Sequence, residues 1–385
     1  MDCNYFPACG GCDFRDKIYA EQLEYKEKFC RNLLKRFNVT EFLPIIPSPQ
    51  TDHYRHKMDF CAGASQNGIL LGMRQKSRST AVVDIKDCRV FFEGLGEILE
   101  IFRQWAKNYC VLAYELYKAS GELRYVSVRH SKFSGKVMVA GVFALTQEQF
   151  AAQNKKFQAL ADQLQKIPQV ASIYFGLNNK LSDETFGDDL RLWSGEKYIK
   201  ERINGIDYFS SPTIFLQSNP LACAKLYQVI KEEAAACPGA GDILDMYCGS
   251  GGITLQLARV SNKIVAVDNS CRNIEDAREN AKLNNINNIE FICEDAEAYL
   301  AKAEPGRFST LILDPPRQGL SKKSLKIILD CGIKNIIYVA CNPLNLREDL
   351  VKLSQLYTVE KAVSVDMFPH TRHLELLVKL TSTTA

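Results

Sequence analysis

The second half of the chain alternates between short apolar runs and segments with helical periodicity, and this alternation restricts the fold more than any other feature. The apolar runs suit buried strands, and they are "GDILDMYC", "KIVAVDNS", "IEFICED", "FSTLILDPPR" and "NIIYVAC". The segments that follow them predict helices at residues 251–260, 271–284, 295–302, 321–331 and 343–354. Strands that alternate with helices predict a parallel sheet with crossover helices, which is an α/β fold.

The first half of the chain has a different pattern. Residues 17–37 repeat apolar residues at helical spacing and predict an amphipathic helix, and residues 150–167 predict another. A proline-rich break lies at residues 44–50, and short β-like runs around turn residues occupy 54–92 and 122–145. The first half is therefore predicted to be an α+β domain with mainly antiparallel strands.

The bulk properties limit the function without identifying it. A length of 385 residues suggests two or three domains, and the absence of a run of about 18 apolar residues argues against a membrane span. The start of the chain lacks the pattern of a secretory signal, so we expect a cytoplasmic protein, a monomer by default. Fourteen cysteines in a reducing compartment suggest metal binding or catalysis more than disulfides. The net charge of +3 neither argues for a nucleic-acid partner nor excludes one.

A cofactor site is predicted where the first strand of the second half ends. This strand carries Asp245 and runs into the loop "CGSGG", in which glycine permits a sharp turn and close approach of a ligand. Asp268 follows 23 residues later at the tip of the next strand, where an acid suits a ribose diol. The loop lacks the G-x-G-x-x-G pattern of dinucleotide sites, and an acidic strand end suits the ammonium group of S-adenosylmethionine. The alternative is an ordinary turn of an α/β fold.

Two more strand ends carry acids with possible roles. Asp295 follows the third strand and could meet the adenine amino group, or it could simply cap the next helix. "LILDPPR" holds Asp314 at the end of the fourth strand with rigid prolines after it. Methyltransferases that act on exocyclic amines often place an aromatic residue after such a motif, and Arg317 stands there instead. This difference disfavours an amine methyltransferase.

The fifth strand ends in Cys341, which could be a nucleophile or a buried filler. Uracil C5 is a poor nucleophile until a thiolate adds to C6, so a thiol beside a methyl-donor site suits methylation of uracil C5. That chemistry needs a base to remove the C5 proton. Glu375 lies in an apolar, strand-like run where burial would raise its pKa, although it could also be a paired structural acid.

With these motifs in order, the chain resembles the RNA uracil-C5 methyltransferase family. The matching segments are "FLQSNP" (215–220), "DMYCGSGG" (245–252), "LDPPR" (313–317), "ACNP" (340–343) and "DMFPHTRHLE" (366–375). The resemblance implies a Rossmann-like class I S-adenosylmethionine-dependent methyltransferase domain. It also implies that Cys341 is the nucleophile and Glu375 the base, and that the S-adenosylmethionine contacts are Gln217, Tyr247, Asp268 and Asp314. A cofactor contact that some members make at position 252 is missing, because this position is glycine.

The N-terminal cysteines match the family as well. Cys3, Cys9 and Cys12 have the spacing C-x5-C-x2-C, and Cys88 stands where iron–sulfur members carry a fourth ligand. Four thiolates can hold a [4Fe–4S] cluster or zinc, and the resemblance favours the cluster, in a structural or RNA-positioning role. The other cysteines are expected to serve packing, and they include Cys30, Cys61, Cys110, Cys223, Cys237, Cys248, Cys271, Cys293 and Cys331.

The resemblance also bears on the RNA. "YRHKMDF" (54–60), "LLGMRQKSR" (70–78) and "GELRYVSVRHS" (121–131) are similar to the subgroup that lacks an N-terminal barrel and modifies uracil 747 of 23S rRNA. Another 23S uracil, the T-loop uracil of tRNA and a catalytically inactive iron–sulfur RNA-binding module remain as alternatives. RNA contacts are expected in these segments, where basic residues alternate with aromatics, although a solvated surface would look the same. These residues are Arg55, Lys57, Arg74, Lys76, Arg78, Arg124 and Arg129, with Tyr54 and Tyr125.

The predicted domains are discontinuous. We expect residues 1–14 and 47–214 to form the iron–sulfur and RNA-binding domain, and residues 15–46 and 215–385 to form the methyltransferase domain. The second domain then includes the helix at 17–37, which the family resemblance suggests packs on the catalytic domain.

Overall fold

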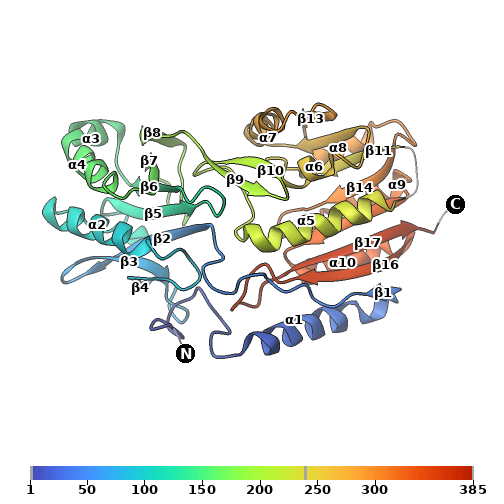
Figure 1. Ribbon diagram of the computed structural model, residues 1–385, viewed down its shortest axis with the longest axis horizontal. Helices are drawn as coiled ribbons and strands as arrows, with labels where there is room; N and C mark the ends of the chain where they lie inside the picture. Colours follow the sequence, from blue (N-terminus) through green and yellow to red (C-terminus); the bar gives the residue numbers. More distant parts are fainter. Residues whose placement is uncertain (1–2, 238–240, 384–385) are drawn as a thin grey trace. The chain divides into compact units, whose positions relative to one another are not determined.

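The structure, a computed structural model, describes residues 3–237 and 241–383 (Figure 1). The chain forms two compact units. Unit 1 comprises Met1–Asp16, Gln50–Glu201 and Phe209–Thr213, and unit 2 comprises Lys17–Pro49, Arg202–Tyr208 and Ile214–Ala385. The few residues of the predicted domains at 1–2, 238–240 and 384–385 lie outside the described part.

Unit 1 is built on a seven-stranded sheet in the order β4-β3-β2-β5-β6-β7-β8. Its strands are β2 (Lys57–Ser65), β3 (Gly68–Arg74), β4 (Val82–Asp84), β5 (Leu123–His130), β6 (Val137–Phe143), β7 (Val170–Leu177) and β8 (Asp189–Gly195). The prediction of antiparallel strands is confirmed except at one pair, because β6 and β7 run parallel. A short ribbon of β9 (Ile199–Ile203) and β10 (Ile206–Ser210) follows the sheet along the chain.

Helices cover one face of this sheet (Figure 1). They are α2 (Leu95–Asn108), α3 (Gln147–Ala152) and α4 (Asn154–Leu164). Apolar residues of α2 and α4 pack with apolar residues of β2, β3, β5, β6 and β7 in one core. Helix α2 was not predicted from the sequence.

Unit 2 contains an eight-stranded sheet in the order β1-β16-β17-β15-β14-β11-β12-β13. Its strands are β1 (Glu41–Phe42), β11 (Asp242–Met246), β12 (Ile264–Asp268), β13 (Ile289–Cys293), β14 (Phe308–Leu313), β15 (Asn335–Ala340), β16 (Tyr357–Val365) and β17 (Glu375–Ser382). Strands β11 to β15 are parallel, which confirms the predicted parallel sheet. Strand β17 is antiparallel to both of its neighbours, β15 and β16.

Helices cover both faces of this sheet. Core residues of α1 (Tyr19–Leu34), α8 (Ala296–Ala301), α9 (Lys322–Asp330) and α10 (Pro343–Leu353) pack together against one face. Helices α5 (Pro220–Ala235), α6 (Gly252–Leu257) and α7 (Cys271–Leu283) belong to the other layer (Figure 1). None of the helices in the described part of the chain combines the length and the apolar character needed to cross a bilayer.

The order of the strands creates a crevice in unit 2. After β11 the chain moves to β12 on one side, and it later returns to β14 on the other side. In open α/β sheets, ligands bind outside the carboxyl ends of the strands at such a reversal of strand order. The residues after β11, β12 and β14 are therefore the first place to look for a ligand site.

Candidate active site

The turn between β11 and α6 has an unusual backbone. Tyr247, Gly249 and Gly251 have φ values of 65°, 54° and 83°, which lie in the left-handed region. Glycine adopts this region freely, whereas at Tyr247 it stores strain of the kind that gathers at functional sites. A Cβ atom at Gly252 would lie 2.5 Å from the hydroxyl of Tyr227, so the missing side chain at position 252 has a packing reason.

Asp268 at the end of β12 has its carboxylate fixed by three donors. The backbone N–H groups of Gly249 and Ser270 each donate to it at 2.9 Å, and the side-chain amide of Asn273 donates at 3.1 Å. These bonds hold the carboxylate at the tip of β12, next to the glycine turn. A hydrogen bond from a ribose diol to this carboxylate stays a prediction.

Asp245 is a buried carboxylate with one oxygen left open. Its side chain is 1% exposed, Thr254 donates a hydrogen bond to Oδ2, and Oδ1 has no hydrogen-bond partner among the described residues. Burial, together with the charges of Asp314 and Asp268, raises the pKa of Asp245 to about 7 against the opposing hydrogen bond from Thr254. A cation at this position would stabilise the carboxylate, so the site fits the ammonium group of S-adenosylmethionine.

Gln217 lies in the segment that precedes α5 and is nearly buried. The same segment is attached to the glycine turn, because the hydroxyl of Ser250 donates to the carbonyl of Phe215 at 2.8 Å. Gln217, Tyr247 and Asp268 therefore belong to one cluster of loops at the carboxyl edge of the sheet. Their contacts with the cofactor remain predictions.

Asp295 acts as the N-cap of α8, since its side chain accepts a hydrogen bond from the N–H of Ala298 at 2.9 Å. This is the structural alternative foreseen from the sequence. A contact between Asp295 and adenine stays a prediction. The hydroxyl of Tyr247 donates to Glu297 of the same helix at 3.0 Å, which ties the glycine turn to α8.

Three candidate residues lie at neighbouring strand ends. Cys341 directly follows β15 and Asp314 directly follows β14, which is the parallel neighbour of β15. Glu375 is the first residue of β17, and Ala340 of β15 is paired with Leu376 of β17. Because β17 is antiparallel, its amino end meets the carboxyl ends of β15 and β14. The sheet thus brings the thiol and the two carboxyl groups to one edge.

The protonation of these groups reflects burial and mutual repulsion. Burial, together with the charges of Glu375 and Asp314, raises the pKa of Cys341 to about 11, although Arg317 opposes the shift. Burial raises the pKa of Asp314 to about 7. The pKa of Glu375 lies well above its ordinary value because the side chain is buried and Asp314 is near, although Arg317 opposes this shift. Burial and the neighbouring acid therefore favour the protonated forms of the thiol and of Glu375 in the ligand-free protein.

A cavity of about 250 Å³ opens beside Cys341. Exposed basic side chains of Arg317, Arg372 and His373 lie in its wall. An opening of this kind next to a thiol can admit an anionic polymer with a base turned out of its stack.

The basic residues of unit 1 differ from the expected RNA surface. Arg124 is buried, and its guanidinium donates to the backbone carbonyls of Asn178, Lys180 and Ser182 at 2.6–2.8 Å. Its hydrogen bonds therefore hold the chain after β7, which corrects the RNA role considered for it. The same correction applies to buried Tyr54.

Three further members of that set also have internal partners. The hydroxyl of Tyr125 and the guanidinium of Arg74 both donate to the carboxylate of Asp183. Arg129 is buried and donates to the carbonyl of Pro212 at 2.6 Å. Basic and aromatic residues that alternate along a strand do not by themselves indicate an RNA-binding surface, because their side chains can point into the protein.

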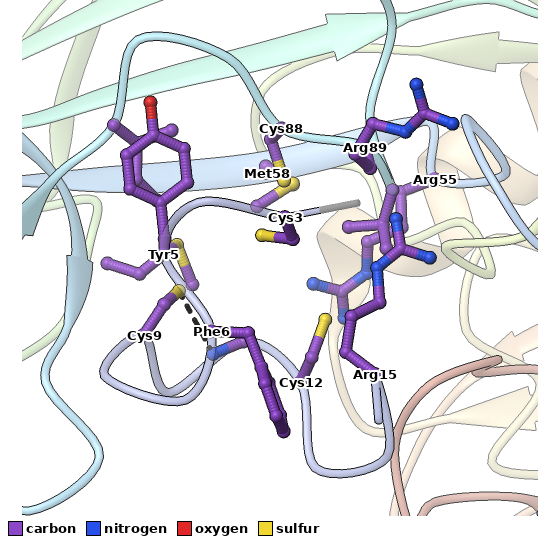
Figure 2. A pocket seen from close by; sticks show the side chains of 14 residues that line it. Cys3, Tyr5, Phe6, Cys9, Cys12, Arg15, Arg55, Met58, Cys88 and Arg89 are labelled. Carbon is purple, nitrogen blue, oxygen red and sulfur yellow. Dashed lines mark hydrogen bonds between the residues drawn. The ribbon is translucent and has the colours of Figure 1, made fainter. Parts of the chain in front are cut away.

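The N-terminal cysteines meet in unit 1. Cys3, Cys9, Cys12 and Cys88 line one cavity of about 30 Å³, and Figure 2 shows their sulfur atoms around it. Cys3, Cys9 and Cys12 come from the N-terminal turns and Cys88 from the segment after β4. The side chains of Arg15, Arg55 and Arg89 also line the cavity.

This cavity does not form a site for a single metal ion. No group of three or more His, Cys, Asp or Glu side chains in the described part of the chain could hold one ion. Burial raises the pKa of Cys12 to about 12 and that of Cys88 to about 11, so both thiols are protonated in the absence of metal. A metal centre would have to displace these protons, because thiolates are the ligand form.

One pair of cysteines differs from the expected packing role. Cys271 and Cys293 form a disulfide, with Cα atoms 5.1 Å apart. Cys271 begins α7, and Cys293 ends β13 as the register partner of Asp268. The disulfide was not predicted from the sequence. The two cysteines are 22 positions apart and come close only when β12 and β13 pair in the sheet.

The fold and the cluster at the carboxyl edge define a methyltransferase that uses S-adenosylmethionine. A family profile described as tRNA (Uracil-5-)-methyltransferase matches residues 18–383. The chain belongs to this family of S-adenosylmethionine-dependent RNA (uracil-C5) methyltransferases. The resemblance to this family that the sequence motifs indicate is thereby confirmed.

Individual relatives cover nearly the whole chain. A tRNA (uracil(54)-C(5))-methyltransferase of Pyrococcus furiosus is 32% identical over 378 residues, which are 98% of this chain and 84% of that protein. An RNA methyltransferase of Leptospira interrogans is 31% identical over 386 residues, with 97% of both chains covered. A solved structure is also similar, that of the Pyrococcus abyssi tRNA (uracil-54, C5)-methyltransferase in complex with S-adenosyl-L-homocysteine. Its comparison with this chain gives a TM-score of 0.78 at 31% sequence identity, and it covers 97% of this chain and 86% of that one.

Asp245 yields a test of the cofactor site. A buried carboxyl whose pKa is raised on folding stabilises the fold at low pH and loses that contribution as the pH rises through about 7. The loss begins near the ordinary pKa of a carboxyl, about 4, so relative to the parent Asp245→Asn should gain about 1–3 kcal/mol in free energy of unfolding between pH 5.5 and pH 8. The same variant should bind S-adenosylhomocysteine at least tenfold more weakly. Thermal unfolding at both pH values and calorimetric titration measure the two effects.

Asp242→Asn is the matched control for this test. Asp242 lies at the other end of β11 and pairs with Arg307 near the surface, so its substitution should change stability by no more than about 0.5 kcal/mol. An Asp245→Asn protein that binds the ligand as well as the parent would contradict the cofactor role.

Proposed function

We propose that this enzyme methylates C5 of uracil 54 in tRNA, with Cys341 as the nucleophile and Glu375 as the base. The observation that carries the chemistry is the meeting of a thiol with buried Glu375 and half-buried Asp314 at the carboxyl edge of a methyltransferase sheet. An amine methyltransferase would have no use for a thiol at this position.

The proposed reaction begins at Cys341. Its thiolate sulfur adds to C6 of the uracil, and the electron pair of the C5=C6 bond moves toward C5 and O4. When bound, S-adenosylmethionine would supply the methyl group as an electrophile: C5 forms the bond to the methyl carbon, the bond from that carbon to the sulfonium sulfur breaks, and S-adenosylhomocysteine is left. Glu375 then takes the C5 proton, the electrons of that C–H bond restore C5=C6, and the bond from C6 to sulfur breaks. Cys341 leaves as a thiolate.

The charges around Cys341 and Glu375 affect how readily these two groups lose their protons. Cys341 and Glu375 both need to lose a proton before they act, and their pKa values are raised in the ligand-free protein. Arg317 lowers both pKa values, and a cationic cofactor near Asp314 would act in the same direction. The role proposed for Arg317 is therefore to favour the thiolate and the carboxylate.

The proposed RNA follows the named relatives. Proteins named as tRNA (uracil(54)-C(5))-methyltransferases align with 98% of this chain, at 32% identity in both Pyrococcus furiosus and Pyrococcus horikoshii. The comparisons do not support the 23S rRNA uracil 747 expected from the sequence segments. That uracil remains the second candidate because residues 54–60, 70–78 and 121–131 resemble the subgroup that modifies it.

We further propose that unit 1 is the RNA-binding domain and that its cysteines hold a [4Fe–4S] cluster. A single zinc ion binds thiolates at about 2.3 Å and needs its ligands gathered around one point. A [4Fe–4S] cluster gives each of four thiolates its own iron, and four cysteines line this one cavity. Arg15, Arg55 and Arg89 would offset the negative charge of a cluster with four thiolates.

Methylation of two RNAs in parallel tests the substrate. Unmodified tRNA and 23S rRNA are incubated with the protein and S-adenosylmethionine, and mass spectrometry of nuclease fragments locates new methyl groups. We expect 5-methyluridine at position 54 of tRNA. A methyl group only in the 23S fragment that contains uracil 747 would overturn the proposed substrate and keep the chemistry.

Iron and sulfide analysis tests the cluster. Anaerobically purified protein should contain about four irons and four acid-labile sulfides per chain, as in a [4Fe–4S] centre. Cys12→Ser should lose most of this iron, whereas Cys110→Ser should keep it because Cys110 is exposed and outside the cavity. One zinc per chain, or no metal in the parent, would refute the cluster.

A further inference from the structure

Part of the wall of the Cys341 cavity comes from a helix at the other end of the chain. Phe29 of α1 and Leu344 of α10 both line this cavity. The two side chains are 36% and 49% exposed, so large apolar groups remain in contact with water beside the thiol. Exposed apolar side chains that border a polar site mark a surface for a ligand.

Helix α1 is fixed in place by a buried ridge. Gln22, Lys26, Cys30 and Leu34 recur every four residues and are almost fully buried, so they form the face of α1 that packs inward. Phe29 precedes Cys30 and stands at the edge of this face. The ring is therefore held by a rigid helix rather than by a flexible loop.

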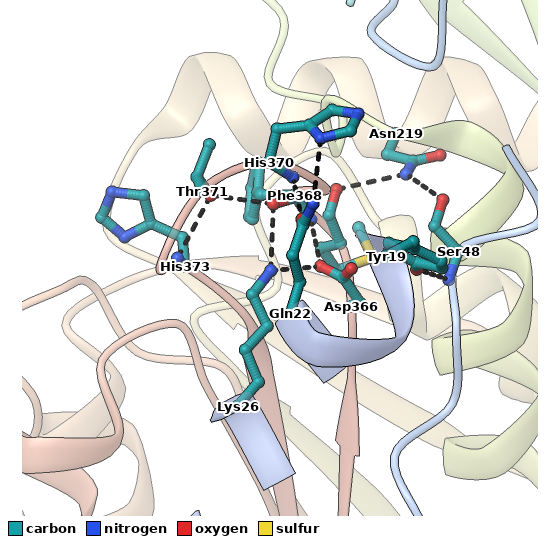
Figure 3. Close-up of polar contacts among 11 residues, drawn as sticks. Tyr19, Gln22, Lys26, Ser48, Asn219, Asp366, Phe368, His370, Thr371 and His373 are labelled. Carbon is teal, nitrogen blue, oxygen red and sulfur yellow. Dashed lines mark hydrogen bonds and ion pairs between the residues drawn. The ribbon is translucent and has the colours of Figure 1, made fainter. Parts of the chain in front are cut away.

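Two polar side chains of the ridge, Lys26 and Gln22, contact the loop that leads into β17 (Figure 3). Lys26 Nζ lies 2.6 Å from Asp366 Oδ1 with both side chains 0% exposed, and it also donates to the carbonyl of Phe368 at 3.1 Å. Gln22 Oε1 accepts a hydrogen bond from the N–H of His370 at 2.8 Å. Removing one partner of a buried ion pair is costly, so the pair sets the position of α1 against this loop.

The loop needs such support and also carries side chains of the cavity. His370 has a φ of 66°, a left-handed conformation that is unfavourable for a residue other than glycine. Arg372 and His373 follow it in the cavity wall, and Glu375 comes next at the start of β17. The contacts of Gln22 and Lys26 therefore hold Phe29 and the basic side chains around one opening.

We propose that Phe29 is a positioning residue, and that its ring stacks on the base next to the target uracil. This inference rests on the proposed function. A uracil that leaves its stack to reach Cys341 also deprives its neighbour of a stacking partner, and an aromatic ring can replace that partner. The target ring itself is not available to Phe29, because sulfur and the methyl donor must both approach its C5=C6 bond perpendicular to the ring. Arg372 in the same wall suits the phosphate between the two nucleotides.

The test uses the full-length protein with the RNA stem-loop that the parent methylates. Phe29→Ala should raise the KM for this RNA by roughly 5- to 100-fold, from the usual strength of base–aromatic stacking, with kcat changed less than about threefold. Phe29→Leu keeps an apolar side chain without an aromatic face and should show a similar defect. Phe29→Tyr keeps an aromatic ring and should therefore have a KM close to that of the parent.

Tyr25→Ala is the matched control. Tyr25 is an exposed aromatic residue one turn earlier on α1 that does not line the cavity, so its loss should leave the KM within about twofold.

A spectroscopic readout adds to the kinetics. A 2-aminopurine placed beside the target uracil should change fluorescence on binding to the parent with S-adenosylhomocysteine, and this change should be lost in Phe29→Leu.

The outcomes separate this inference from the proposed function. If the parent methylates the RNA and Phe29→Leu keeps the parent KM and fluorescence change, stacking by Phe29 is refuted. If kcat falls in Phe29→Leu while KM stays constant, the residue acts on the chemistry and the inference is also wrong. If the parent methylates no RNA although it binds S-adenosylhomocysteine, the proposed function itself has failed.

Discussion

The antiparallel strand β17 is the constraint on which the site depends. A sheet made only of parallel strands presents carboxyl ends along one edge, and each strand contributes the loop at its carboxyl end. Strand β17 runs the other way between β15 and β16, so its first residue, Glu375, joins that edge beside Cys341 and Asp314. The buried surroundings then raise the pKa values of all three groups. Both the position of Glu375 beside Cys341 and Asp314 and the raised pKa values of these groups therefore depend on the direction of β17.

The same arrangement makes the ligand-free protein less stable than its fold allows. Asp245 is buried and Asp314 is half-buried, burial raises the pKa of each carboxyl to about 7, and the charge of Asp314 contributes to the shift at Asp245 through repulsion between the two carboxylates. A cationic cofactor removes that repulsion, so part of its binding energy offsets strain already present in the protein. The left-handed residues Tyr247 and His370 add backbone strain on either side of the site, and packed contacts hold both in place.

Much of the fold of unit 2 could be predicted from the sequence, because buried parallel strands and amphipathic helices have strong periodic signals. The candidate residues could be named by their chemistry, since a thiol and acids at strand ends have few roles. Strand β16, the direction of β17 and the Cys271–Cys293 disulfide were not predicted, because each depends on tertiary pairing. Helix α2 was also missed, although Leu95, Leu99 and Phe102 have helical spacing. The place of Phe29 in the cavity wall depends on the docking of α1 through Lys26 and Asp366, which are 340 residues apart.

The central claim, covalent catalysis by Cys341 with Glu375 as the base, is tested most directly by trapping. RNA in which the target uracil carries fluorine at C5 is incubated with the protein and S-adenosylmethionine, because fluorine cannot leave as a proton. We expect a covalent protein–RNA adduct on denaturing gels that Cys341→Ala abolishes and Glu375→Gln retains. An adduct that survives in Cys341→Ala, or its absence from parent protein loaded with cofactor, would contradict the account.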